Sequence, residues 1–206
     1  MTRRVILALG ANLGDRAATI ESALRDLDAR PEIAVVAGSR VYETPALTLT
    51  GIDDTEPRYL NACALLEVAE TLSARALLDV LRALEDESGR QRQVRWGSRT
   101  LDLDIVDFGG LEQSTRVLTL PHPRAGDRAF VLAPWMDLEP DAVLAGRGPI
   151  AELRAAAADR VDPVGRIVVD REAAEAEERS VRVVLDGAAG GEAPANAACG
   201  LAEPGR

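Results

Sequence analysis

The sequence predicts an α+β fold, in which helices pack on one face of an antiparallel sheet. Segments with strand character and segments with helical spacing follow one another in the order β-α-β-β-α-β. This order is typical of the ferredoxin-like arrangement, so we expect a ferredoxin-like antiparallel sheet with helices packed on it. The chain has 206 residues, 47% of them hydrophobic, which suits one well-buried domain with little left for a second.

The first half of this pattern consists of one strand, one capped helix and two further strands. Apolar and β-branched residues predict the first strand over 5–9. Asp15 is a suitable N-cap for the next helix, whose apolar residues recur at helical spacing until Pro31. The segments 33–42 and 59–68 then have strand character, and each is predicted as one strand.

The second half contains another capped helix and the last strand of the sheet. Ser73 can cap a helix with a leucine stripe that ends near Gly89. Residues 91–98 have no apolar periodicity and are predicted as a loop. The next segment runs as a strand to Phe108, and a last helix is predicted over 149–158.

Composition divides the chain near residue 170. The last part is rich in alanine, glycine and glutamate and has few large apolar residues. Such a segment buries too little apolar surface to offset the entropy of ordering it. We therefore predict a domain over 1–169 and a disordered acidic tail over 170–206.

Charge and residue usage exclude several classes of function. The net charge of −10 argues against a general nucleic-acid binder, whose affinity depends on neutralising phosphates. Every one of the 24 cationic residues is arginine, so a Schiff-base lysine and a lysine-dependent phosphate loop are both excluded. No apolar run approaches the roughly 18 residues of a membrane span. The two cysteines lack metal-site spacing, which leads us to expect a cytoplasmic protein.

Two aspartates in the last strand of the sheet are the first candidate site. Asp102 and Asp104 alternate with apolar residues, so their carboxylates point to the same face of the strand, roughly 7 Å apart. Mg²⁺ commonly takes one or two carboxylates together with the phosphate oxygens of a nucleotide. A solvated edge strand would carry the same alternation, although aspartate is depleted in strands.

Arginines gather immediately before this strand, in a segment that also contains glycine and tryptophan. Arginine can bind phosphate bidentately, so the segment has the composition of a loop that closes over phosphates. A solvated surface is the alternative. His122, the only histidine, can hold a phosphate or serve a structural role. Tyr59, Trp96 and Phe130 can form a slot for a flat heterocycle or pack in the core.

Seven segments together resemble the 6-hydroxymethyl-7,8-dihydropterin pyrophosphokinase family. They occur in the order of that family and cover roughly residues 4 to 145. The segments are LGANLGD at 9–15, YETP at 42–45, YLNA at 59–62, GR at 89–90, RWGSRTLDLD at 95–104, LPHP at 120–123 and RAFVL at 128–132.

The resemblance implies transfer of the pyrophosphoryl group of ATP to the hydroxymethyl group of 6-hydroxymethyl-7,8-dihydropterin, with release of AMP, in folate biosynthesis. It implies Arg90 and Arg99 as catalytic residues, and Asp102 and Asp104 as ligands of two Mg²⁺ ions bound with ATP. The implied pterin site contains Thr44, Pro45, Tyr59, Asn61, Trp96, Asp102 and Phe130. The implied ATP site contains Glu85, Arg92, Arg95, Thr119, His122 and Arg128. We expect a monomer that binds neither nucleic acid nor a membrane.

Two other functions fit a ferredoxin-like sheet. A nucleotidyl transferase or cyclase with paired aspartates would release pyrophosphate from ATP rather than AMP. An RNA-binding module would carry basic and aromatic residues across the sheet, whereas this chain is acidic and has few aromatic residues.

Overall fold

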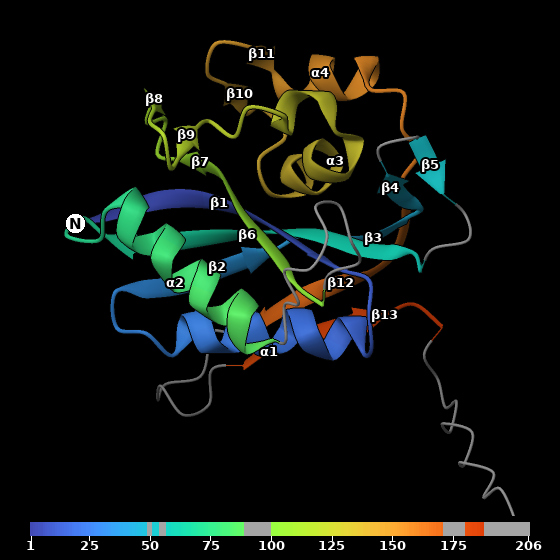
Figure 1. Ribbon diagram of the computed structural model, residues 1–206, viewed down its shortest axis with the longest axis horizontal. Helices are drawn as coiled ribbons and strands as arrows, with labels where there is room; N and C mark the ends of the chain where they lie inside the picture. Colours follow the sequence, from blue (N-terminus) through green and yellow to red (C-terminus); the bar gives the residue numbers. More distant parts are fainter. Residues whose placement is uncertain (49–50, 54–56, 89–99, 171–179, 188–206) are drawn as a thin grey trace, which may run out of the picture.

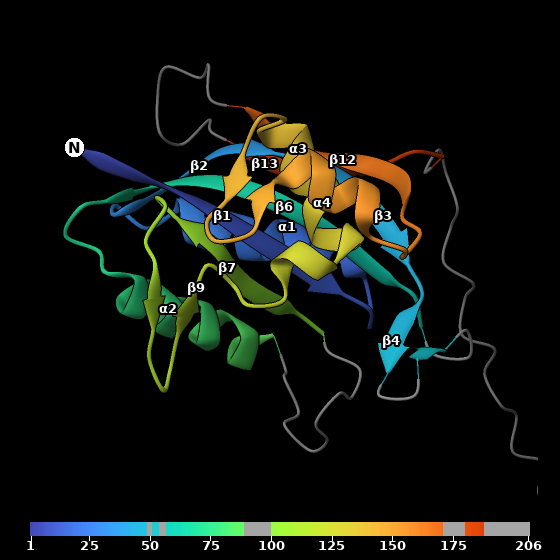
Figure 2. The same ribbon diagram turned by 90° about the horizontal axis from the view of Figure 1, so that it is seen from above.

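The structure is a computed structural model that describes residues 1–48, 51–53, 57–88, 100–170 and 180–187 (Figures 1 and 2). Its main sheet contains β1 (Thr2–Ala11), β2 (Ile33–Gly38), β3 (Arg40–Thr44), β6 (Tyr59–Ala69), β7 (Asp102–Phe108), β12 (Asp162–Asp170) and β13 (Ser180–Leu185). The strand order is β13-β12-β3-β6-β1-β7, with β2 also paired to β6, and every pairing is antiparallel. The predicted α+β fold is confirmed.

The helices of the described residues are α1 (Arg16–Asp28), α2 (Ala74–Glu87), α3 (Ala129–Leu138) and α4 (Ile150–Ala156), with a 3₁₀ turn at Ala125–Asp127. Both predicted N-caps are confirmed. The Ala18 N–H donates to the Asp15 carboxylate at 3.0 Å, and the Ala76 N–H donates to the Ser73 hydroxyl at 3.1 Å. No helix within the described ranges is long and apolar enough to cross a membrane.

Within the described residues, three short two-stranded antiparallel sheets accompany the main sheet. They pair β4 (Ala46–Thr48) with β5 (Gly51–Asp53), β8 (Gln113–Ser114) with β9 (Thr119–Leu120), and β10 (Val143–Leu144) with β11 (Gly148–Pro149).

Helices cover both faces of the sheet, whereas the sequence pattern predicted one face. Figure 1 shows α1 and α2 on one side of the sheet and α3 and α4 on the other. The strands are apolar on both faces: Val5 and Leu7 pack toward α1 and α2, while Ile6, Cys63 and Val106 form a second core with α3 and α4. A sheet buried on both faces needs a helical layer on each.

The segment predicted as one strand over 33–42 is broken into β2 and β3 at Ser39. The Ser39 N–H donates to the Cys63 carbonyl at 3.0 Å, and the Ser39 hydroxyl accepts the Cys63 N–H at 2.9 Å. The preceding Gly38 leaves room for β12, since a Cβ there would lie 2.3 Å from Ile167. At the break, the Ser39 side chain thus accepts a backbone N–H of the neighbouring strand β6.

The prediction that 170–206 is a disordered tail is wrong for residues 180–187. β13 pairs with β12 and lies beside α1, where Glu21 accepts the Val183 N–H at 2.8 Å. Arg25 donates to the Val181 carbonyl at 3.2 Å and pairs with Glu21 at 2.6 Å. The ordered strand is explained by alternating valines at 181–184 and by these bonds to its free edge. Residues 171–179 and 188–206 lie outside the described residues.

Candidate active site

Three of the predicted site residues meet around Gly10, at the end of β1. Gly10 is paired with Asn61 of β6 on one side and with Asp102 of β7 on the other. A Cβ built on Gly10 would lie 3.4 Å from the Asn61 amide oxygen and 3.9 Å from both the Asp102 Cβ and the Tyr59 ring. The side chains of Tyr59, Asn61 and Asp102 therefore surround one point above the sheet. No feature of the sequence pattern indicated Gly10 itself as the centre of this group.

The two aspartates lie on one face of β7, as the alternation predicted. Leu101, Leu103 and Ile105 are buried on the opposite face. Asp102 and Asp104 are half-buried, and the Asp104 side chain is 43% exposed. Both side chains are therefore partly exposed to solvent. Oxygen donors of this kind fit Mg²⁺ that is also held by phosphate oxygens.

Glu85 of α2 supports the backbone between these two aspartates. It is only 4% exposed, and its carboxylate accepts the Leu103 N–H at 2.9 Å. β7 is the last strand of the sheet within the described residues, so this N–H would otherwise lack a ladder partner. The structure thus places Glu85 behind the strand. Its predicted contact with ATP stays a prediction.

His122 lies next to Asp104, with its Nε2 3.8 Å from the Asp104 Oδ2. Its Nδ1 accepts the Arg124 N–H at 3.2 Å, so the neutral ring carries its proton on Nε2, the nitrogen that faces the carboxylate. Burial is the largest influence on the ring and lowers the pKa of His122, while Asp104 opposes this shift. The sequence left a phosphate-binding role and a structural role open, and the structure brings this ring to the proposed metal ligands.

Thr44 and Asn61, two residues of the implied pterin site, form a buried hydrogen bond with each other. The Asn61 amide donates to the Thr44 hydroxyl at 2.9 Å, and each residue is 7% exposed. Thr44 is also the register partner of Tyr59 in the pairing of β3 with β6. Pro45 follows directly and leads into β4. Two of the polar residues assigned to the pterin, Thr44 and Asn61, are therefore held together by a buried hydrogen bond.

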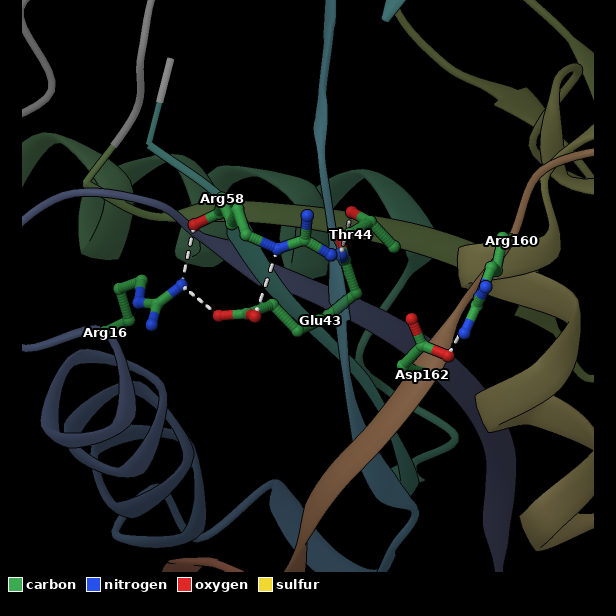
Figure 3. Close-up of polar contacts among 7 residues, drawn as sticks. Arg16, Glu43, Thr44, Arg58, Arg160 and Asp162 are labelled. Atoms are coloured by element: carbon green, nitrogen blue, oxygen red, sulfur yellow. Dashed lines mark hydrogen bonds and ion pairs between the residues drawn. The ribbon is translucent and has the colours of Figure 1, made fainter. Parts of the chain in front are cut away.

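An arginine–glutamate cluster that the sequence did not indicate supports this group (Figure 3). Glu43 accepts from Arg16 at 2.9 Å and from Arg58 at 3.0 Å. Arg16 also donates to the Arg58 carbonyl at 2.8 Å, immediately before Tyr59. Because Glu43 precedes Thr44, the cluster joins both ends of the connection between β3 and β6 to the start of α1.

The remaining described site residues lie near the α3 side of the sheet. Arg128 and Phe130 flank the first residue of α3, and the Arg128 guanidinium lies over the Phe130 ring, 5.3 Å from its centroid. Thr119 and His122 line a cavity of about 480 Å³ that also contacts the β10–β11 hairpin. Of the predicted site residues, those outside the described residues are Arg90, Arg92, Arg95, Trp96 and Arg99.

Residues 6–140 match the family 7,8-dihydro-6-hydroxymethylpterin-pyrophosphokinase (HPPK). The chain is 42% identical over 156 residues to 2-amino-4-hydroxy-6-hydroxymethyldihydropteridine pyrophosphokinase of Pseudomonas aeruginosa, covering 76% of this chain and 93% of that protein. The enzyme of the same name from Methylorubrum extorquens is 37% identical over 162 residues, 77% of this chain and 99% of that protein. The chain belongs to this family.

The pyrophosphokinase fold is also found in solved structures. The structure of Plasmodium falciparum HPPK-DHPS wild type has a TM-score of 0.55 and 14% identity, and the match covers 76% of this chain and 41% of that longer protein. At this identity the match shows the fold alone. Family membership confirms the predicted activity of a pyrophosphokinase of folate biosynthesis, a transferase that moves the pyrophosphoryl group of ATP to 6-hydroxymethyl-7,8-dihydropterin.

Proposed function

We propose that the pyrophosphokinase binds its two substrates side by side over the ends of β1, β6 and β7. The observation that carries this proposal is the convergence of Tyr59, Asn61 and Asp102 around Gly10. Asp104 lies next to this group, farther along the same face of β7, and the His122 Nε2 lies 3.8 Å from the Asp104 Oδ2. A pterin contacting the group around Gly10 would then have its hydroxymethyl arm directed toward the carboxylates that hold the nucleotide.

Asp102 and Asp104 are proposed to hold two Mg²⁺ ions that enter with ATP. The fit rests on the donor set, which is two half-buried carboxylates on one strand face with phosphate oxygens left to complete the coordination. When bound, Mg²⁺ neutralises charge on the triphosphate.

In the reaction, the hydroxymethyl oxygen forms a bond to the β-phosphorus of ATP, and the bond from that phosphorus to the α-phosphate oxygen breaks. AMP leaves with the bonding electron pair, and the hydroxyl proton is released. Such transfers depend on positioning and charge stabilisation rather than on covalent catalysis. The described residues position the reactants, while Arg90 and Arg99 are proposed to stabilise the charge that develops.

The nucleotide is proposed to extend from the aspartates along His122 and Thr119. These two residues line the cavity of about 480 Å³, and Arg128 lies on the same side of the sheet at the start of α3. The neutral His122 ring can donate its Nε2 proton to a phosphate oxygen. Arg92, Arg95 and Trp96 stay predicted contacts of the segment before β7, and the expected cytoplasmic monomer stays a prediction.

An assay of nucleotide products tests the proposed site. The wild-type protein with MgATP and 6-hydroxymethyl-7,8-dihydropterin should form AMP only when the pterin is present. Asp104→Asn should reduce kcat by about 10³-fold or more while leaving the unfolding transition intact, since it removes a metal ligand from a half-buried position. Asp107→Asn is the matched control, because Asp107 lies on the same strand and accepts the Gly110 N–H at 3.1 Å.

Each other outcome of this assay has a distinct meaning. Formation of pyrophosphate would indicate a nucleotidyl transferase or cyclase, and unchanged ATP would indicate a binding module. An Asp104→Asn variant with the kcat of Asp107→Asn would refute the metal assignment while leaving the family reaction intact.

A further inference from the structure

A carboxylate from outside the family match holds the start of α3. Both oxygens of Asp159 accept the Ala129 N–H, at 3.0 and 2.8 Å. Ala129 is the first residue of α3 and is fully buried. Asp159 follows α4 and lies 30 residues along the chain from its partner, beyond the matched range 6–140.

The first turn of α3 needs such a partner. The initial N–H groups of a helix have no acceptor within the helix, and the N-cap residue, Arg128, provides no side-chain cap. The Arg128 carbonyl instead accepts the N–H groups of Val131 and Leu132, both at 3.0 Å. A carboxylate at this end also interacts favourably with the helix dipole. Asp159 therefore fixes the position at which α3 begins.

The residues on either side of Ala129 are the two α3 residues assigned to substrates. Arg128 is assigned to ATP and Phe130 to the pterin, and the guanidinium of the first lies over the ring of the second. The Ala129 N–H that Asp159 accepts lies between them in the chain. We propose that Asp159 is a positioning residue that aligns Arg128 with the nucleotide and Phe130 with the pterin at the same time. This inference rests on the proposed function of those two residues.

The packing of α4 places Asp159 at this position. Ile150 of α4 is buried in the second core with Val131, Leu132 and Trp135 of α3, and Leu153 packs against the same core. Figure 1 shows α4 beside α3 on the same side of the sheet. The Ala157 N–H donates to the Leu153 carbonyl at 3.0 Å and ends the helix two residues before Asp159. A peripheral helix thereby supports the substrate site through one side chain.

The test compares KM with kcat in Asp159 variants. Asp159→Ala should raise KM for both ATP and the pterin, each between about 3- and 30-fold, the range expected from losing a helix cap. A purely structural defect would lower the fraction of active enzyme, and with it the apparent kcat, without changing either KM. Asp159→Asn keeps one acceptor oxygen for the Ala129 N–H and should restore both KM values to within about threefold of the wild type.

Asp162→Ala is the matched control. Asp162 lies three residues farther along the chain, and its carboxylate pairs with Arg160 at 3.1 Å (Figure 3). Its KM values should equal those of the wild type. Amide hydrogen exchange gives a readout without substrate: the Ala129 amide should lose protection in Asp159→Ala and keep it in Asp159→Asn and Asp162→Ala.

Unchanged KM values in an active Asp159→Ala variant would overturn the inference. KM values of Asp159→Asn as high as those of Asp159→Ala would overturn it as well. If Asp159→Ala does not fold, Asp159→Gln is tested instead, since it shifts the acceptor oxygen by one methylene group. This variant must raise KM for both substrates. KM values equal to those of the wild type would again overturn the inference. A wild-type protein that forms no AMP would instead refute the proposed function, which is a separate result.

Discussion

The buried glutamate behind β7 allows a quantitative test of how the aspartates are held. Glu85→Ala removes the carboxylate that accepts the Leu103 N–H at 2.9 Å. A buried hydrogen bond to a charged group contributes about 1.5–3 kcal/mol, and the vacated volume adds a cavity cost. Relief of a buried charge offsets part of this loss. We therefore expect Glu85→Ala to lower the free energy of unfolding by about 2–4 kcal/mol, a large share of the roughly 5–15 kcal/mol of a typical domain.

A second variant, Glu85→Gln, tests whether the hydrogen bond of Glu85 to the strand also affects Mg²⁺ binding. Glu85→Gln keeps an oxygen at the same place and should lose only about 1 kcal/mol. Urea unfolding gives the free energy of unfolding of both variants, and the two values are compared if the m-values are equal. The Mg²⁺ concentration for half-maximal AMP formation is measured in the same preparations. Glu85→Ala should need several times more Mg²⁺ than the wild type, and Glu85→Gln should stay close to it. Equal stability of the two variants, or a Mg²⁺ requirement unchanged by alanine, would refute the reasoning.

Three further predictions address the centre of the site, the sheet edge and the histidine. Gly10→Ala should fold normally, because its Cβ would meet no atom closer than 3.4 Å. The variant should raise KM for the pterin about tenfold and leave KM for ATP unchanged. Equal effects on both substrates would contradict the proposed location of the pterin. Glu21→Ala should cost about 1 kcal/mol and expose the Val183 amide to hydrogen exchange, and unchanged protection would exclude the edge contact. In the metal-free protein, NMR titration of His122 should give a pKa below the ordinary value, and Asp104→Asn should lower this pKa further because the carboxylate raises it. Since the unfolded chain then binds the proton more tightly, stability should fall as the pH drops below about 6.5, and a His122→Gln variant should lose this dependence.

Local patterns predicted α1, α2 and α4 and the strands β1, β6 and β7, although not every element of the fold. The N-caps Asp15 and Ser73 were predictable because a capping side chain bonds only three residues away. The alternation in β7 predicted one acidic and one apolar face for the same reason. The second helical layer was not predicted, since burial of Ile6 and Val106 depends on packing against α3, which follows much later in the sequence. Strand β13 was missed because its valines lie between segments of low apolar content.

The candidate site shows the same division between local and distant contacts. Spacing along β7 predicted that Asp102 and Asp104 share a face, whereas the roles that the motifs imply for the residues around them stay predictions. The contacts of Arg16 span 27 residues to Glu43 and 42 residues to the Arg58 carbonyl. No periodicity relates positions at such separations. These contacts arise only when β3, β6 and α1 meet in the folded domain, so their contribution to the site required the structure.

Carboxylates illustrate why residue type alone does not reveal a role. Asp104, Glu85 and Asp159 are all acidic, but their surroundings give them different chemistry. The Asp104 side chain is 43% exposed and is proposed to hold a metal, whereas Glu85 is 4% exposed and accepts a backbone N–H. Asp159 likewise accepts an N–H at a helix start. Both supporting carboxylates act on amides left unpaired by a strand edge or a helix end, and both amides lie directly beside proposed substrate or metal contacts. Since the backbone positions a ligating side chain, we expect these two capped amides to set the geometry of the proposed metal and substrate contacts.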